Sequence, residues 1–308
     1  MDMKRFLISL SLFILIIALL ASGLSALSDY AINQRKDKVL TISKDITRVF
    51  MGDSNIECAI NDSLITNSIN VAQSGEAYLY TYIKLKSLLE CNNQIQTIFL
   101  GFSYVDLLKD TEEKWLFNEG FVIERTAAYS YLMNYPEKYL IVKNNPKAYF
   151  RGLMKSIISN SRTFINSFSS EDGRIQNFGG YEYLVRDKLQ EEIKINQLVN
   201  EKPHEKALIQ EKYLIMISQL CQQKSIKLVL LNTPKHKSYF SNDRISAEQI
   251  WLSVRNSLSG DSLLDLSTLA YPDSYYGDII HLNYIGAKVF SGYLNERLNT
   301  HQDDSSIE

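Results

Sequence analysis

The sequence has 308 residues, of which 45% are hydrophobic and 22% charged, and this is an ordinary composition for a globular protein with a full core. The net charge of −2 and a pI near 6.2 provide no basic field, so nucleic acid is not an expected partner. The cysteines are odd in number and widely spaced, which is typical neither of a disulfide framework nor of a metal site. We expect three buried free thiols, at Cys58, Cys91 and Cys221.

The N-terminal segment predicts a membrane anchor over residues 1–28. Lys4 and Arg5 precede an uncharged, strongly apolar stretch that is long enough to cross a bilayer as a helix. Positive residues on this flank favour a cytoplasmic N-terminus and an exported body, periplasmic or extracellular. A cleaved signal peptide with its site near Gly23 is the alternative, and it would give a secreted form. The anchor is favoured because the apolar stretch continues past that site.

Beyond a polar linker or helix at 29–46, short apolar runs alternate with amphipathic segments. This alternation predicts a parallel sheet covered by helices on both faces, a three-layer α/β/α fold over residues 47–300, followed by a polar tail at 301–308. The predicted strands cover residues 49–51, 65–71, 95–100, 226–231 and 262–266. A first short helix is predicted to begin near Ile56. Four further helices are predicted over residues 76–91, 204–223, 247–258 and 285–298.

The segment from about 107 to 200 interrupts this alternation and is rich in aromatic residues. It has few strand signals, so we expect a mostly helical insertion that ends in a loop near Phe178-Gly-Gly-Tyr181. Its tyrosines and tryptophan could line a glycan groove, although aromatic residues in such a segment more often form core.

The turn at Gly52-Asp53-Ser54 is the first candidate for chemistry. It follows the buried run Val49–Met51 and precedes a helical pattern, which places Ser54 at the carboxyl edge of the sheet and at a helix start. A nucleophile would be well placed there. The simpler interpretation is that both polar residues only cap the helix.

A general base for Ser54 is sought among four histidines. His281 lies between the last strand and the last helix, three residues after Asp278, which is close enough to orient its ring. Alternatively, Asp278 and Asn283 only cap that helix. His236 follows a predicted strand and is a second candidate base. We expect the remaining two, His204 and His301, to be solvated.

These motifs, in this order, resemble the SGNH (GDSL-like) hydrolase family. The resemblance includes Gly52-Asp-Ser54, Asp278-Ile-Ile-His281 and the following Leu282-Asn-x-x-Gly286-Ala, and it covers roughly residues 49–298 without the insertion. It implies a flavodoxin-like sheet. Gly75 falls where the family places its oxyanion-hole glycine, and Gly101-Phe-Ser-Tyr104 falls where it places Gly-x-Asn-Asp.

The resemblance implies that Ser54 is the nucleophile, His281 the base and Asp278 its orienting carboxylate. The N–H groups of Ser54 and Gly75 would form the oxyanion hole. Ser103 stands where the family has an asparagine that donates to the oxyanion. Either the Ser103 hydroxyl donates in its place, or the site lacks this third donor. The residues expected to line the substrate site are Asp53, Asn55, Tyr104 and His236.

A membrane-anchored SGNH-like domain is similar in layout to proteins that modify cell-surface polymers. The sequence therefore predicts a serine esterase or O-acyltransferase that acts on an acylated envelope glycan or glycolipid, with a membrane acyl-donor protein as a further partner. The residues leave hydrolysis and transfer open, because water and a sugar hydroxyl can both resolve an acyl-serine. The competing hypothesis is a catalytically impaired glycan-binding or assembly protein. No metal or other cofactor is expected.

Overall fold

The computed structural model describes residues 3–166, 179–196, 205–239, 243–258 and 261–300. His204, His301, Phe178 and the predicted tail lie outside these residues.

Two compact units make up the chain. Unit 1 combines Met1–Thr41 with Val122–Ile175, and unit 2 combines Ile42–Phe121 with Gln176–Glu308.

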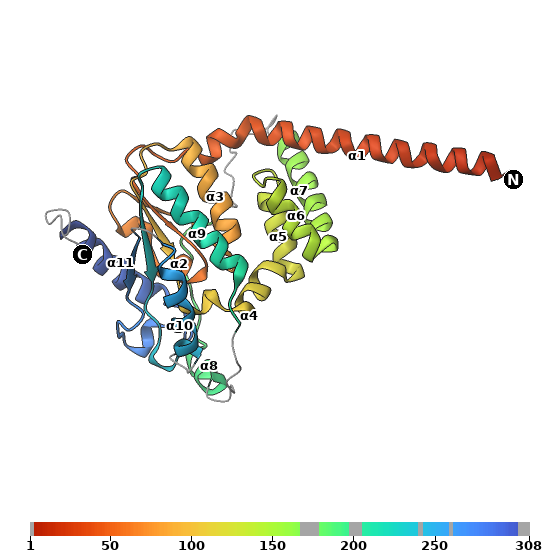
Figure 1. Ribbon diagram of the computed structural model, residues 1–308. Helices are drawn as coiled ribbons and strands as arrows, with labels where there is room; N and C mark the ends of the chain where they lie inside the picture. The colour runs from red at the N-terminus through yellow and green to blue at the C-terminus, as the bar shows by residue number, and fades with distance from the viewer. Residues whose placement is uncertain (1–2, 167–178, 197–204, 240–242, 259–260, 301–308) are drawn as a thin grey trace. The chain divides into compact units, whose positions relative to one another are not determined.

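Unit 2 is built on a five-stranded parallel sheet (Figure 1), which confirms the predicted fold class. The strand order β2-β1-β3-β4-β5 is the flavodoxin-like order, in which ligands bind beyond the carboxyl ends of the strands where the order reverses. Its strands are β1 (Arg48–Met51), β2 (Ser68–Asn70), β3 (Thr97–Gly101), β4 (Lys227–Asn232) and β5 (Ser262–Asp265).

The central strands are buried on both faces, as their continuous apolar runs predict. Val49, Phe50 and Met51 are fully buried in β1, which pairs with β2 and β3. Phe50 and Phe99 lie opposite each other in register and stack with ring centroids 4.7 Å apart. These contacts fix where β1 ends, and therefore where Ser54 lies.

Helices cover both faces of this sheet (Figure 1). One layer contains α3, which packs on α9, and the other contains α2, which packs on α11. The helices predicted from periodicity are present with small shifts at their ends. The helices of this unit are α2 (Ser54–Ala59), α3 (Tyr78–Cys91), α4 (Lys109–Glu112), α8 (Leu189–Asn196), α9 (Leu208–Gln223), α10 (Asp243–Arg255) and α11 (Tyr284–Thr300).

Between β3 and α9 the described residues contain helices and no named strand, in keeping with the predicted helical segment. A short π-helix, Glu113–Phe117, continues α4. Short 3-10 helices are found at Asp62–Leu64, Tyr104–Leu107, Lys237–Tyr239 and Asp273–Tyr275.

The described part of unit 1 consists of helices joined by short turns. It contains α1 (Met3–Leu40), nearly all of α5 (Glu119–Tyr129), α6 (Tyr135–Asn144) and α7 (Pro146–Asn166), and α7 packs on both α1 and α6. Residues Met3–Leu24 are long and apolar enough to cross a membrane, as a signal sequence at this place would also be. The segment predicted as a linker or helix is helical as far as Leu40.

Candidate active site

The turn after β1 brings Ser54 to the carboxyl edge of the sheet. Gly52 has φ +135°, and a Cβ there would lie 3.0 Å from the Cα and N of Gly101, so the ends of β1 and β3 approach each other closely. Asp53 caps α2 by accepting a hydrogen bond of 2.9 Å from the N–H of Asn55. The capping interpretation is therefore correct for Asp53, and it leaves the Ser54 hydroxyl available.

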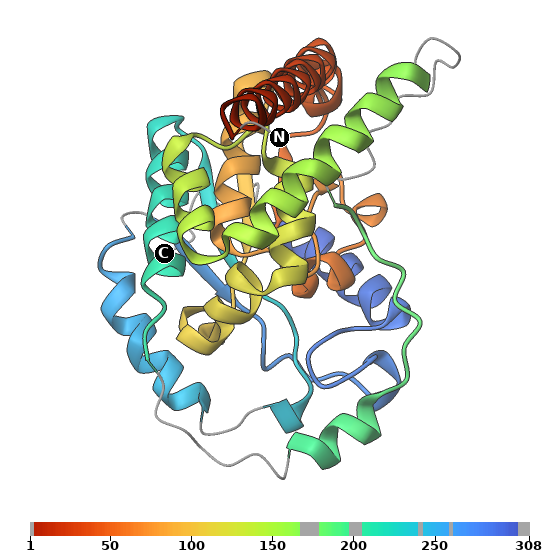
Figure 2. The ribbon, with the colours of Figure 1, turned by 90° about the vertical axis from the view of Figure 1, so that its right-hand side faces the viewer.

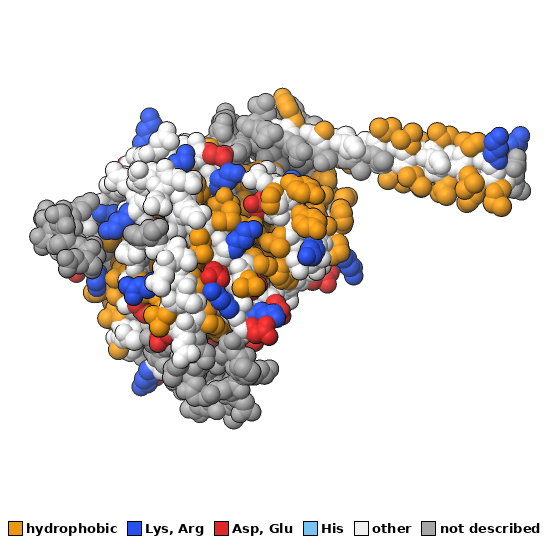
Figure 3. Space-filling model, in the orientation of Figure 1, with side chains coloured by type: hydrophobic (Ala, Val, Ile, Leu, Met, Phe, Trp, Pro, Cys, Tyr) orange, Lys and Arg blue, Asp and Glu red, His pale blue; other side chains and the backbone are white. Residues whose placement is uncertain are grey.

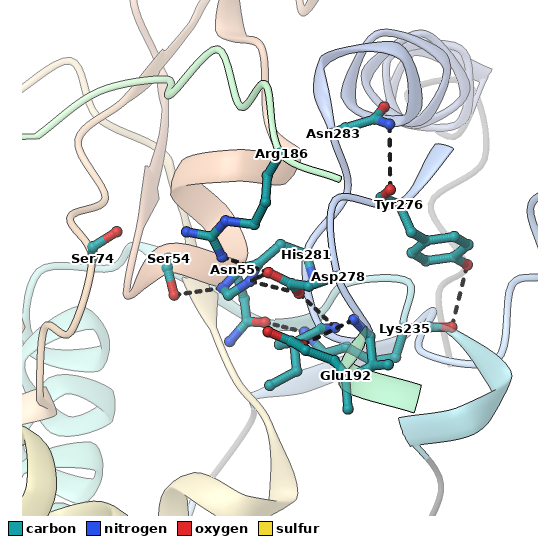
Figure 4. A network of polar contacts seen from close by, with 12 residues as sticks. Ser54, Asn55, Ser74, Arg186, Glu192, Lys235, Tyr276, Asp278, His281 and Asn283 are labelled. Carbon is teal, nitrogen blue, oxygen red and sulfur yellow. Dashed lines mark hydrogen bonds and ion pairs between the residues drawn. The ribbon is translucent and has the colours of Figure 1, made fainter. Parts of the chain in front are cut away.

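The structure joins Ser54, His281 and Asp278 in one hydrogen-bonded chain (Figure 4). The Ser54 Oγ lies 2.8 Å from His281 Nε2, and His281 Nδ1 lies 2.9 Å from both carboxylate oxygens of Asp278. The carboxylate favours the imidazole with its proton on Nδ1, so Nε2 is the nitrogen that accepts from the serine. Two residues 227 positions apart meet in this way.

Asp278 is held by more than the histidine. It is buried and accepts backbone hydrogen bonds from Ile280 (2.9 Å) and His281 (2.8 Å), while Arg186 Nη1 lies 2.5 Å from its Oδ2. Burial by itself raises the pKa of Asp278, but the hydrogen bond and charge of His281, the Ile280 N–H and Arg186 outweigh it. Its pKa is well below the usual range, and the group stays ionised at every physiological pH.

The loop that carries His281 is fixed by the next helix. Asn283 accepts from the N–H groups of Ile285 and Gly286 at the start of α11, and its amide donates 2.8 Å to the carbonyl of Ser274. A Cβ on Gly286 would lie 2.2 Å from the carbonyl oxygen of Tyr275. The Asn-x-x-Gly pattern after the histidine therefore has a local structural reason, which is to seat the loop on α11.

Gly75 lies on a buried loop beside the Ser54 turn. The N–H of Gln73 donates 2.9 Å to the carbonyl of Gly52, which joins the two loops. Gly75 has φ +65°, and a Cβ there would lie 2.5 Å from a ring carbon of Phe121 and 2.8 Å from Trp115. Only glycine fits without movement of these rings. Among the described residues, none accepts a hydrogen bond from the N–H of Gly75 or of Ser54.

A fully buried ion pair between Lys84 of α3 and Glu76 holds the loop that contains Gly75. Lys84 Nζ lies 2.8 Å from Glu76 Oε2 and 2.5 Å from the carbonyl of Val71, and the Thr81 hydroxyl donates 3.0 Å to Glu76 Oε1. Both charged side chains have no exposed surface, so each depends on the other for its stability. The position of Gly75 is tied in this way to α3.

Ser103 lies on the loop after β3 and is buried. Its N–H donates 2.7 Å to Asp106 Oδ2, which also lies 3.2 Å from the Tyr78 hydroxyl. Burial raises the pKa of Asp106, and the charge of Asp53 raises it further. The backbone N–H of Ser103 is thus used within the fold, and only its hydroxyl could serve an oxyanion.

Lys235, which the sequence did not single out, lies beneath the Ser54 turn. Its Nζ donates to the side-chain oxygen of Asn55 and lies 3.1 Å from the Thr233 hydroxyl, and burial lowers the pKa of Lys235 to about 8. Asn55 in turn donates to both oxygens of Asp53, at 3.0 and 2.8 Å. Asn55 and Asp53 thus take part in positioning the first turn of α2.

His236 and Tyr104 are engaged elsewhere. The ring of His236 is buried, with Nε2 3.3 Å from Asp273 Oδ1, and its Nδ1 accepts from the N–H of Ser238 at 3.2 Å. The Tyr104 hydroxyl donates 2.8 Å to Asp265 at the end of β5. The ring that contacts Ser54 is that of His281.

Arg186 is the second residue that the sequence did not reveal. It belongs to the extended segment 179–188, which is hydrogen-bonded to the site loops through Gly180 N–Ala72 O (3.0 Å), Glu182 N–Glu57 O (2.9 Å) and Lys188 N–Gly277 O (2.8 Å). A Cβ on Gly179 would lie 2.0 Å from the carbonyl oxygen of Ala72. Arg186 lies 92 positions from Asp278, so no local spacing could have indicated it.

The three cysteines are free thiols, as predicted; Cys58 and Cys221 are buried, whereas Cys91, at the end of α3, is only partly buried, contrary to the prediction. Burial raises the pKa of both Cys58 and Cys221 to about 12. In the part of the chain that the structure describes, no group of three or more His, Cys, Asp or Glu side chains is arranged to hold a metal ion.

Comparisons with known proteins give distant similarities. A family model that carries no description matches residues 176–302, less than half of the chain, and no curated protein matches significantly. Among solved structures, the chain is similar to a candidate platelet activating factor from Streptococcus pneumonia, with 13% identity, a TM-score of 0.44, and coverage of 92% of this chain and 98% of that one. It is also similar to a candidate acylhydrolase from Bacteroides fragilis, with 11% identity, a TM-score of 0.40, and coverage of 87% and 94%.

Proposed function

We propose that this protein is an exported serine esterase or O-acyltransferase that works through an acyl-serine at Ser54. The observation that supports this most strongly is the hydrogen-bonded chain from the Ser54 hydroxyl through His281 to Asp278, with links of 2.8 and 2.9 Å. These distances lie within the range in which a general base can take a proton from a nucleophile.

In the first half of the reaction, Ser54 Oγ attacks the carbonyl carbon of an ester while His281 Nε2 takes its proton. The imidazolium that forms is stabilised by the ionised Asp278. The carbonyl oxygen becomes an oxyanion, for which the N–H groups of Ser54 and Gly75 are the proposed donors. When the ester C–O bond breaks, His281 returns the proton to the leaving alcohol and the acyl group stays on Ser54.

In the second half, a hydroxyl compound attacks the acyl-serine with His281 again acting as base. Water gives hydrolysis and a sugar hydroxyl gives transfer, and the same residues serve both. Arg186 is a positioning residue in this scheme, because its guanidinium contacts Oδ2 of the Asp278 carboxylate that orients His281.

The proposed substrate is an acylated glycan or glycolipid of the cell envelope, with a membrane acyl-donor protein as a further partner. Two features support this: the candidate membrane span at Met3–Leu24, and the basic residues Lys4 and Arg5 at its N-terminal end, which favour export of the body of the protein.

A chromogenic acetyl ester supplied to the purified full-length protein in detergent tests the chemistry. We expect release of the chromophore by the wild type and by Ser63→Ala, a change at an exposed serine, and essentially none by Ser54→Ala. A wild-type rate in Ser54→Ala would overturn the assignment of the nucleophile. Addition of a soluble oligosaccharide then separates the two activities, because a transferase forms an acylated sugar in preference to free acetate.

A second candidate is a glycan-binding protein that has the fold but little turnover. It is favoured by Ser103, whose shorter side chain replaces the asparagine that the SGNH family places here. The two candidate functions predict different ester turnover for the Ser103→Asn variant. An enzyme that lacks one oxyanion donor gains ester turnover, and a binding protein without an activated serine remains inactive.

A further inference from the structure

The exposed face of α7 carries two parallel rows of side chains. Phe150, Met154 and Ile158 follow one another at four-residue spacing and are 57%, 53% and 49% exposed. A basic row with the same four-residue spacing lies beside them and consists of Lys147, Arg151 and Lys155, each three residues before one of the apolar residues. We call these six residues the α7 face.

The opposite side of α7 is packed within unit 1. Ala148 is fully buried and Ser156 nearly so, and a Cβ on Gly152 would lie 2.6 Å from Thr126 Cβ and 2.7 Å from the Ile123 carbonyl oxygen. Helix α7 is therefore pressed against α5, and its orientation is fixed by that contact. The α7 face points outward as a consequence, and its large apolar side chains are a feature that a water-facing helix does not require.

The direction of α7 relative to α1 is the second observation. The two helices pack on each other within unit 1. In Figure 1 α7 runs across α1 and not alongside it, and Figure 2, which looks nearly along α1, shows α7 in the plane of the picture. A helix that crosses a membrane-spanning helix in this way lies parallel to the membrane surface.

The packing also lies close to the end of the candidate span. In Figure 1, α7 meets α1 in the part of α1 that lies near its C-terminal end, away from the N-terminal end of the candidate span at Met3–Leu24. From Leu24 to Leu40, α1 is about 24 Å long at 1.5 Å per residue. Helix α7 is thus within reach of the bilayer surface. Figure 3 shows hydrophobic side chains gathered over the helices of unit 1, on the side from which the N-terminal part of α1 projects.

We propose that the α7 face rests in the headgroup region of the bilayer that α1 crosses, with a preference for anionic lipids. The apolar row enters the acyl boundary and the basic row contacts phosphate groups, which is the pattern of an interfacial amphipathic helix. Charge supports a lipid: over the described part of α6 and α7, the acidic Glu137 is buried, whereas Lys138, Lys143, Lys147 and Arg151 are positive. The charge of Lys155 is offset by Glu124 of α5, which lies 2.5 Å from it.

Helix α6, which packs on α7, also exposes aromatic residues. Tyr135 and Tyr139 on α6 are 79% and 56% exposed and stack with ring centroids 6.2 Å apart. Tyrosine is favoured at membrane interfaces, where its ring is buried and its hydroxyl stays in contact with water. The inference is independent of the chemistry at Ser54, and it rests on α1 spanning a bilayer.

Fluorescence quenching in nanodiscs tests the proposal on the full chain. Cys91→Ser leaves only the buried Cys58 and Cys221, and an NBD probe is attached to Met154→Cys, to Leu12→Cys in the candidate span, or to Gln223→Cys at the exposed end of α9. Lipids that carry a doxyl group near the headgroup then quench a probe in the interface, and lipids that carry it near the end of the acyl chain quench a probe at the centre of the span, where Leu12 lies. We expect loss of emission at Met154→Cys and Leu12→Cys, and none at Gln223→Cys.

Charge and lipid composition provide the control. Quenching at Met154→Cys should be greater in discs of phosphatidylcholine with phosphatidylglycerol than in phosphatidylcholine alone, and Lys147→Glu with Arg151→Glu should remove this difference while quenching at Leu12→Cys is unchanged. The proposal is wrong if the Met154→Cys probe is as unquenched as the Gln223→Cys probe while Leu12→Cys is quenched.

Two other outcomes are possible. A Met154→Cys probe with blue-shifted but unquenched emission would indicate a protein partner on the α7 face. An unquenched Leu12→Cys probe would exclude the membrane span. Either outcome also overturns the proposal.

Discussion

Two histidines in the described part of unit 2 lie next to an aspartate, and they differ in what meets the second ring nitrogen: a serine hydroxyl for His281 and a backbone N–H for His236. His281 has Asp278 2.9 Å away, in a carboxylate that is 2% exposed and held by two backbone N–H groups and Arg186. His236 has Asp273 3.3 Å away, in a carboxylate that is 57% exposed. The second ring nitrogen of His281 faces Ser54, whereas that of His236 accepts a backbone N–H. A His–Asp pair is thus useful for catalysis only where its carboxylate is fixed and its other nitrogen is available.

The largest effect should distinguish these two histidines directly. In the proposed mechanism His281→Ala removes the base, and ester turnover should fall by about 10⁴-fold or more. His236→Ala, which touches neither Ser54 nor Asp278, should stay near the wild-type rate. The comparison is measured as kcat/KM with a chromogenic ester, after circular dichroism has shown that both variants fold. A loss of equal size in His236→Ala would remove the distinction.

A change at Gly75 tests the proposed oxyanion hole beside Ser54 and His281. Gly75→Ala places a Cβ within 2.5 Å of the Phe121 ring and disfavours φ +65°, so the loop must shift and its N–H must move away from the oxyanion. Loss of one such donor costs about 3 kcal/mol, which is roughly a hundredfold fall in kcat. The effect should appear in kcat more than in KM. Gly120→Ala, at an exposed position with an ordinary contact at 3.4 Å, is the matched control.

The third prediction concerns Arg186, which has no counterpart beside His236. Its side chain is 40% exposed, and a partly screened ion pair of this kind contributes about 1 kcal/mol, so Arg186→Gln should lower kcat/KM by about fivefold. Without the cation, the full negative charge of Asp278 acts on His281, and the acid limb of the pH–rate profile should move to higher pH. Arg186→Lys should restore the limb. If the acid limb of the pH–rate profile is at the same pH in Arg186→Gln as in the wild type, Arg186 has only a structural role.

The smallest effect is on stability at low pH. The pKa of Asp278 is below its unfolded value of about 3.9, so its contribution to the free energy of unfolding is fully present above that pH and is lost as the pH falls through the folded pKa. Asp278→Asn should therefore be less stable than wild type near neutral pH, and the difference should shrink in acid. Urea unfolding of the full chain from pH 7 downward measures it. A difference that stays constant with pH would contradict the assignment.

Much of the sheet could be predicted from local pattern alone. The apolar runs at Val49–Met51 and 226–231 are too short and too continuous for amphipathic helices, and strands separated by helices leave few alternatives to a parallel sheet. The carboxyl ends of parallel strands lie at the same edge of the sheet, and this rule was enough to predict that Ser54, Asp278 and His281 lie at that edge. Their approach to 2.8–2.9 Å is a property of the fold, and no sequence spacing contains it.

Arg186 and Lys235 could not be predicted for a related reason. Arg186 is in an extended segment without periodicity, and its partner is 92 positions away. Lys235 is next to His236 in the loop after β4, and a lysine in a polar loop is expected to be solvated, yet it is 3% exposed. Burial of a charge at a sheet edge depends on which loops converge there, and that is decided by tertiary packing.

Labelling by a fluorophosphonate, followed by peptide mass spectrometry, tests the central claim most directly. The account predicts a covalent adduct on Ser54 of the wild-type protein, much slower labelling in His281→Ala, and none in Ser54→Ala. Unchanged labelling in His281→Ala, or a folded wild-type protein that stays unlabelled, would contradict the claim that this imidazole activates this hydroxyl.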